Sequence, residues 1–268
     1  MTTDNSPLTA EDPWHSLKQF TSARIALGHA GSSLPTKANL DFQLAHALAK
    51  DAANIPLDFG KLEQVLNVQG YKTLSLQTQA ETHQIYLQRP DKGRLLNPAS
   101  IESLQRTVQQ IKAPDIAIIV ADGLSSNAIE NHAVPVLSLL IPRLCSKGYL
   151  VPPISLVKYG RVAIGDHISE LFSARMCVVL IGERPGLSSP DSMGIYFTYQ
   201  AKVGSTDADR NCISNIHKNG LSYEQAVEKL IFLITEADRL HFSGVRLKDE
   251  TANISLEHTK KPANFLLD

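Results

Sequence analysis

Residues 176–186, "MCVVLIGERPG", combine a continuous apolar run with an abrupt polar turn, and this combination decides the predicted fold. Every position from Met176 to Ile181 is apolar, which predicts a strand that is buried on both faces. Glu183, Arg184 and a Pro-Gly pair then end the strand, because proline and glycine are typical of turns. Strands buried on both faces are typical of parallel sheets with helices above and below.

The same pattern recurs through the C-terminal part of the chain. Further apolar strand segments are "DIAIIVADG" (115–123), "ISLVKYG" (154–160) and "GIYFTYQ" (194–200). Helical segments over about residues 97–111, 125–147, 166–174 and 222–241 alternate with these strands. This alternation predicts an α/β fold with a Rossmann-like, mostly parallel sheet and helices on both faces.

Local signals mark several helix ends. Asn97 before Pro98 predicts a helix start, and Ser222 with Gln225 forms a capping-box pattern at the start of the last helix. Gly244 is predicted to end that helix.

The N-terminal part has a different pattern. Helical spacing of apolar residues predicts one helix over residues 12–27 and another over about residues 36–52. Alternating leucine and isoleucine residues at 74–76 and 85–87 predict short strands. We therefore expect two domains: an N-terminal helical region with short strands over residues 1–96, and a Rossmann-like domain over residues 97–268.

Polar corners follow three of the predicted strands. They read "ADGLSSN" (121–127), "YGRVAIGDH" (159–167) and "GERPGLSSPDS" (182–192). Ligands of open parallel sheets bind beyond the carboxyl ends of the strands, so these corners predict one shared binding edge. Glu183 is expected on this edge; the alternative is a solvated ion pair between Glu183 and Arg184 on a surface loop.

Composition excludes several classes of partner. The chain has 268 residues, 43% of them hydrophobic and 20% charged, with a formal net charge of -1. This balance gives no electrostatic reason to expect nucleic acid or a membrane surface as partner. No apolar stretch approaches the ~20 residues of a membrane-spanning helix, and the N-terminus lacks the pattern of a signal peptide. We expect a soluble protein with reduced, intracellular cysteines.

The common catalytic and cofactor motifs are absent from the sequence. Neither a dinucleotide-binding nor a P-loop glycine pattern occurs. The nine histidines do not have metal-ligand spacing, so His132, His167 and His217 are expected to pack or to form hydrogen bonds, and no metal site is predicted. "DGLSSN" lacks the second glycine of a nucleophile turn, which favours Ser125 or Ser126 as a helix cap.

Six segments together resemble the small (light) chain of ethanolamine ammonia-lyase, an adenosylcobalamin-dependent enzyme. They are "TSARIALGHAGSSLPT" (21–36), "LQRPDKGR" (87–94), "IVADGLSSNAIENHA" (119–133), "GRVAIGD" (160–166), "LIGERPGLSSPDS" (180–192) and "DADRNCISNIHKNGLSYEQA" (207–226). They occur in the order of the family and extend over nearly the whole chain.

The resemblance implies an assembly of large and small chains, six of each in a dodecamer. The catalytic residues are expected on the large chain and none on this one, which covers adenosylcobalamin at the subunit interface. The family's cofactor contacts correspond to Val162, Glu183 and Cys212 in this sequence. The benzimidazole of the nucleotide is expected to stay on cobalt, without a histidine ligand from this chain. The implied location is the cytoplasm or the interior of a bacterial microcompartment.

Two other functions remain open at this point. The alternative hypothesis is that the chain is a non-catalytic α/β interaction module that only scaffolds a partner enzyme. It is also compatible with an independent hydrolase built on Ser125 or Ser126. The sequence does not assign a contact to Arg184, which could touch the cofactor, the partner chain or only Glu183.

Overall fold

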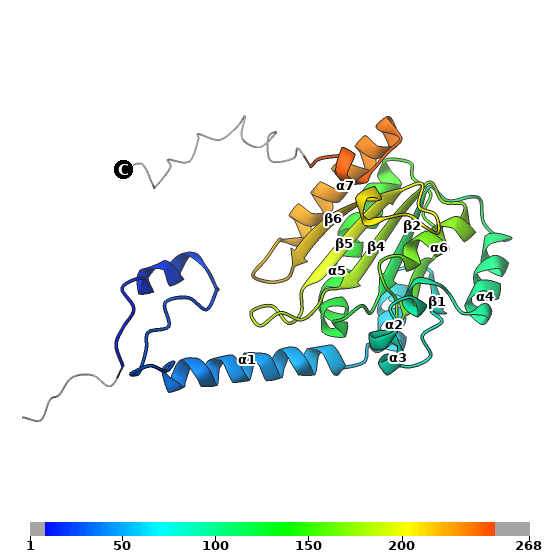
Figure 1. Cartoon of the computed structure of the whole chain (residues 1–268). Helices are drawn as coiled ribbons and strands as arrows, with labels where there is room; N and C mark the ends of the chain where they lie inside the picture. Colours follow the sequence, from blue (N-terminus) through cyan, green and yellow to red (C-terminus); the bar gives the residue numbers. More distant parts are fainter. Residues whose placement is uncertain (1–8, 250–268) are drawn as a thin grey trace, which may run out of the picture.

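The computed structural model describes residues 9–249, which contain one six-stranded sheet (Figure 1). The sheet order is β1-β3-β2-β4-β5-β6. The strands are β1 (Thr73–Gln77), β2 (Ile116–Ala121), β3 (Ile154–Lys158), β4 (Met176–Gly182), β5 (Met193–Tyr199) and β6 (Arg210–Ile216).

The sheet is mixed. The pairs β1–β3, β3–β2 and β2–β4 are parallel, whereas β4–β5 and β5–β6 are antiparallel. The α/β prediction is confirmed, and the parallel character predicted for the sheet does not extend to β5 and β6. Only a loop without a crossover helix joins β4 to β5, and such a connection returns the chain in the antiparallel direction.

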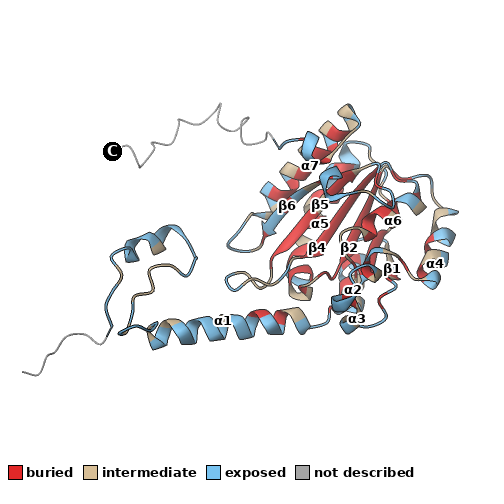
Figure 2. Ribbon diagram, in the orientation of Figure 1, coloured by how far each residue is buried: buried red, intermediate tan, exposed pale blue. Residues whose placement is uncertain are grey.

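Helices cover both faces of the central strands. One face packs against α2 (Phe59–Val68), α5 (Ser126–Ser146) and α7 (Tyr223–Leu240), and the other against α4 (Pro98–Val108) and α6 (Ile164–Phe172). Alternate residues of β2 enter the two cores, which explains why this strand is apolar at every position. The central strands are accordingly buried (Figure 2).

The predicted helix starts are confirmed. The Asn97 side chain accepts a hydrogen bond from the Ser100 N–H, and Ser222 and Gln225 form a capping box. The prediction that Gly244 ends α7 is wrong. The helix ends at Leu240, and His241 takes the left-handed conformation directly after it.

The N-terminal predictions are confirmed only in part. The helix over residues 36–52 is α1 (Thr36–Asn54), but the helix predicted over residues 12–27 is wrong, because only η1 (His15–Phe20), a short 3-10 helix, forms there. No residue of η1 is buried, so the segment lacks the packing that stabilises most protein helices. The strand predicted at 85–87 is also wrong, since these residues lie in α3 (His83–Gln88).

The division of the chain near residue 96 stays a prediction, and the sheet crosses that position because β1 pairs with β3. The remaining short elements are η2 (Lys92–Arg94), η3 (Asp207–Asp209) and η4 (Gly244–Arg246). Within residues 9–249, no helix is both long and apolar enough to cross a membrane.

Candidate functional site

Hydrogen bonds join the three polar corners into one edge. The buried Asp122 carboxylate, directly after β2, accepts from the backbone N–H groups of Tyr159 (2.8 Å) and Gly160 (3.1 Å), which follow β3. The Leu124 N–H donates to the Gly182 carbonyl at the end of β4 (3.0 Å). The predicted shared edge at the carboxyl ends of these strands, which we call the rim, is therefore present.

Burial also affects the acidity of the rim. It raises the pKa of Asp122 to about 6, although the backbone N–H groups of Tyr159, Gly160 and Gly123 lower it. The rim is tightly packed as well: a Cβ atom at Gly182 would lie 2.1 Å from the Ser125 carbonyl oxygen, so no other residue fits there without movement.

Glu183 is anchored on the rim. Its Oε2 accepts hydrogen bonds from the Ser192 hydroxyl (2.5 Å) and from the Asn215 N–H (3.4 Å), and its own N–H donates to the Ser192 carbonyl (2.9 Å). Gly194 leaves the space that the carboxylate occupies, because a Cβ there would lie 2.8 Å from Oε1. Arg184 is exposed and forms no ion pair with Glu183 within the described chain. Glu183 is thus a fixed group rather than half of a solvated pair.

Cys212 lies beside Tyr196 on the neighbouring strand. The two residues are register partners of β6 and β5, so their side chains are neighbours on one side of the sheet. Desolvation by neighbouring groups raises the pKa of the Cys212 thiol, Tyr196 lowers it, and the Glu183 carboxylate raises it further. Burial and the same neighbours raise the pKa of Tyr196. Both raised pKa values favour the neutral forms of the two groups.

The structure thus brings together Glu183 and Cys212, two of the predicted site residues, with Tyr196 between them. Sequence reasoning missed Tyr196. A usable signal was the alternation in "GIYFTYQ", which places Gly194, Tyr196 and Thr198 on one side of β5. Near the rim this side of the sheet is open, since Cys212 and Ser214 are exposed.

Val162 lies apart from this cluster. It occupies the turn between β3 and α6, half-buried against the core on the α6 side, and its carbonyl accepts the Gly165 N–H (3.1 Å). Because β2 lies between β3 and β4, the strand ends leading to Val162 and Glu183 are two strand spacings apart, about 10 Å. One ligand must span that width to contact both residues.

β6 is held in place by a buried ion pair. The Arg210 guanidinium donates to both carboxylate oxygens of Asp166 (2.6 and 2.8 Å) and to the Ser205 carbonyl (2.8 Å). Asp166 lies in α6, so the pair connects this helix to the strand that carries Cys212.

The remaining candidates have structural partners. The Ser125 side chain accepts from the Ala128 N–H as the cap of α5 and donates to the Pro190 carbonyl (2.9 Å). Nδ1 of His132 lies 2.8 Å from the Tyr223 hydroxyl, and Nδ1 of His167 accepts the Leu96 N–H (3.1 Å). Among residues 9–249, no group of three or more His, Cys, Asp or Glu side chains is arranged to hold a metal ion.

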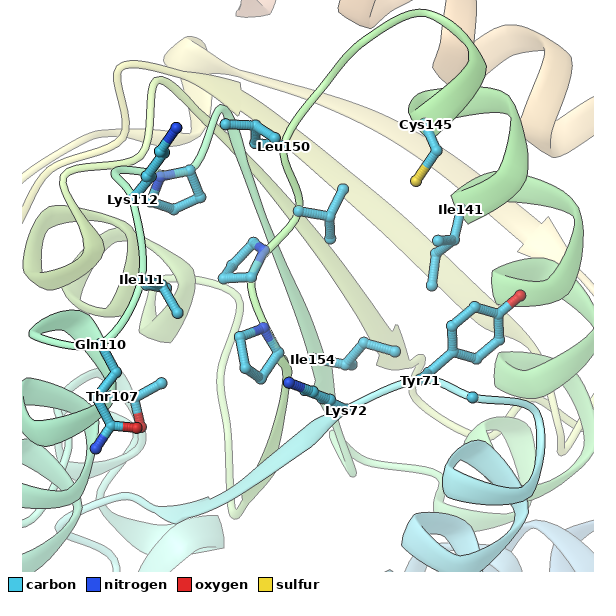
Figure 3. Close-up of a pocket in the computed structure, with 15 residues that line it drawn as sticks. Tyr71, Lys72, Thr107, Gln110, Ile111, Lys112, Ile141, Cys145, Leu150 and Ile154 are labelled. Carbon is cyan, nitrogen blue, oxygen red and sulfur yellow. The ribbon is translucent and has the colours of Figure 1, made fainter.

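A hollow of about 590 Å³ lies at the opposite end of the sheet (Figure 3). Its lining includes Lys72 and Ile154, at the amino ends of β1 and β3, together with Ile111 and Cys145. The lining contains no carboxylate or imidazole group, and none of the predicted site residues belongs to it. The rim remains the candidate site.

Comparisons with known proteins identify the family of the chain. The chain matches the family described as "Ethanolamine ammonia-lyase light chain" over residues 11–248. It is 51% identical over 266 residues to the "Ethanolamine ammonia-lyase small subunit" of Azotobacter vinelandii, covering 98% of each chain. Its identity to the proteins of that name is 49% in Pseudomonas aeruginosa (strain UCBPP-PA14), over 97% of this chain and 96% of the other, and 49% in Pseudomonas putida (strain KT2440), over 98% of both. The chain therefore belongs to the ethanolamine ammonia-lyase light-chain family and is a subunit of a lyase.

Proposed function

We propose that this chain completes an adenosylcobalamin site at its interface with the large subunit of ethanolamine ammonia-lyase. The assembled enzyme converts ethanolamine to acetaldehyde and ammonia, and the reacting groups belong to the large subunit. The observation that supports this proposal is the anchored Glu183 carboxylate on the open side of the sheet, with Tyr196 and Cys212 beside it.

The chemistry of the rim residues fits a corrin. One Glu183 oxygen, Oε2, is held by Ser192 and Asn215, while Oε1 receives no hydrogen bond from the described residues. A fixed carboxylate oxygen is a strong acceptor for the amide N–H groups at the corrin periphery. The separation of about 10 Å between the strand ends of Val162 and Glu183 requires a ligand with a broad, flat face, and a corrin has one.

Each residue then has a defined task. Glu183 accepts an amide N–H and fixes the orientation of the ring, and Val162 supplies backbone groups and apolar contact. Cys212 and Tyr196 provide a neutral surface that excludes water. The cofactor, when bound, supplies a cobalt–carbon bond whose homolysis generates the radical, and the protein supplies orientation.

The same proposal includes the finer features of fold and assembly. In this proposal β1 to β4 form a Rossmann-like arrangement, and the ligand binds at the carboxyl ends of these parallel strands, as ligands of open α/β sheets do. The assembly consists of six large and six small chains. It is located in the cytoplasm or in a bacterial microcompartment.

The test is a cofactor titration of the assembled complex of both subunits. Adenosylcobalamin is added in the dark and binding is followed by its visible spectrum, for the wild type and for Glu183→Ala. Loss of a hydrogen bond to a charged acceptor is expected to weaken binding by about 1–3 kcal/mol, or about 5- to 150-fold. The complex should still assemble, because the substitution removes no core side chain.

The matched control is Arg184→Ala, which removes a charge from the adjacent, exposed position. Its cofactor affinity should equal that of the wild type. Equal affinity of the Glu183→Ala complex would instead indicate an interaction module that only scaffolds the large subunit.

A further inference from the structure

Helix α1 projects away from the sheet, and most of its apolar side chains face water (Figures 1 and 2). Only Ala49 and Ala52 of this helix are buried. Leu40, Leu44 and Leu48 recur every four residues along one side and are 57%, 61% and 53% exposed. Packing within the described chain does not explain this stripe of leucines.

The opposite side of α1 is apolar as well. At 100° per residue, Phe42 lies roughly 160° around the helix from Leu44, and it is 44% exposed. A helix that is apolar on more than one side is normally enclosed by other protein. A single flat contact would leave one of the two sides of α1 in water.

The segment before α1 extends this surface. Its chain folds back on itself through the hydrogen bonds that Ala10 and His29 exchange (2.9 and 3.1 Å). Trp14 and Leu34 are 67% and 58% exposed. We call residues 9–54 the N-terminal arm.

The arm reaches the rim. The Arg24 guanidinium donates to the Leu187 carbonyl (3.3 Å), in the same β4–β5 loop that begins with Glu183. In Figure 1, the N-terminal segment in blue and the β4–β5 loop in yellow-green approach each other. The arm therefore contacts the loop that carries Glu183.

The exposed apolar area is sufficient for a stable interface. The contributing side chains are Trp14, Leu17, Leu34, Leu40, Phe42, Leu44 and Leu48. Each presents on the order of 100 Å². Together they approach the roughly 800 Å² that each partner contributes to a standard interface.

We propose that the N-terminal arm docks into an apolar groove of the large subunit and attaches the small subunit beside the cofactor site. The large subunit is the favoured occupant because the arm adjoins the rim, and this step depends on the proposed function, in which the rim faces that subunit. A second copy of this chain fits less well. Two α1 helices paired across a two-fold axis would cover one side of each helix and leave the other in water.

The test compares two double variants of α1. Leu40→Glu with Leu44→Glu places two charges on the leucine stripe, whereas Asn39→Glu with Gln43→Glu places the same charges on the polar side of the same turns. All four side chains are exposed, so both variants should unfold at the wild-type temperature. Binding to the large subunit is measured by light scattering and by titration. We expect the leucine variant to bind at least about 100-fold more weakly and the control to bind as the wild type does.

A second measurement uses Trp14, the only tryptophan of the chain. With 5-fluorotryptophan incorporated into this chain alone, the fluorine resonance should shift when the large subunit is added and should not change with the concentration of the small subunit. An unchanged resonance, or a leucine variant that binds the large subunit normally, would overturn the proposal. The proposal would also be overturned if the wild-type chain formed a dimer, the leucine variant did not, and the leucine variant still bound the large subunit.

Failure of the proposed cofactor function has a different result. In that case the Glu183→Ala complex assembles and binds adenosylcobalamin with wild-type affinity. The leucine variant still binds the large subunit weakly, and the control variant still binds it normally.

Discussion

The ion pair between Asp166 and Arg210 offers a sharp test of how β6 is held. Both side chains are almost fully buried, 3% and 5% exposed, and two hydrogen bonds join them. Asp166→Asn keeps the shape of the side chain and removes its charge. The guanidinium of Arg210 then stays in the interior without its carboxylate partner. Among the described residues, the one other ion pair of Arg210 is with Asp207, whose carboxylate is 3.6 Å from Nε and fully exposed.

The expected cost follows from this geometry. Removal of one partner from a buried pair costs about 3–5 kcal/mol, because an uncompensated charge remains in the interior. An exposed pair would cost less than about 1 kcal/mol. Replacement of both residues, as Asp166→Leu with Arg210→Met, removes the stranded charge and should return the stability to within about 2 kcal/mol of the wild type.

Urea unfolding of the chain, followed by far-ultraviolet circular dichroism, measures these differences. Trp14 fluorescence is a poor probe, because this residue lies in the arm and not in the core. A cost below about 1 kcal/mol for Asp166→Asn would refute the reasoning. So would a double variant that is less stable than the single one, because the loss would then come from packing rather than from charge.

Three further predictions concern the rim. The pKa of Asp122 is raised to about 6, above the roughly 3.9 of an unfolded aspartate. The stability that its protonated form contributes is complete below about pH 4 and is lost as the pH rises to about 6. Over that range the free energy of unfolding of the wild type, measured in urea, should fall by about 3 kcal/mol relative to that of Asp122→Asn. The same pH dependence in both proteins would contradict this prediction. Gly182→Ala places a Cβ 2.1 Å from a carbonyl oxygen and should lower the free energy of unfolding by at least about 1–3 kcal/mol, whereas Gly60→Ala, 3.4 Å from its nearest contact, should not. Tyr196→Phe removes the phenol hydroxyl, which lowers the pKa of the Cys212 thiol, so alkylation of Cys212 at pH 8, measured by mass spectrometry, should become slower. An unchanged rate is the contrary result.

The sequence predicted elements whose signal is local. The strands β2 and β4 are apolar at each position because each has a core on both sides. Helix starts at Asn97 and Ser222 were predicted because a capping side chain acts on its own next few residues. β6 escaped prediction, since polar and exposed residues interrupt its apolar ones.

The candidate site was only partly predictable for the same reason. Glu183 was placed on the rim because the end of β4 is a local feature. Its anchors, Ser192 and Asn215, lie on later segments that reach it only in the folded chain. Tyr196 became a member of the site through its pairing with Cys212, and no pattern within β5 alone specifies that pairing.

The change from parallel to antiparallel pairing after β4 creates the open surface at which the site lies. Parallel neighbours need crossover connections, and the crossover helices α5 and α6 cover the faces of the central strands. β5 and β6 return without such a helix, so near the rim α7 covers one of their faces and the other carries the exposed Cys212 and Ser214. An additional parallel unit in place of β5 and β6 would bury that face beneath its own helix. The mixed sheet is thus the feature that leaves Glu183 and Cys212 beside an open face of the sheet.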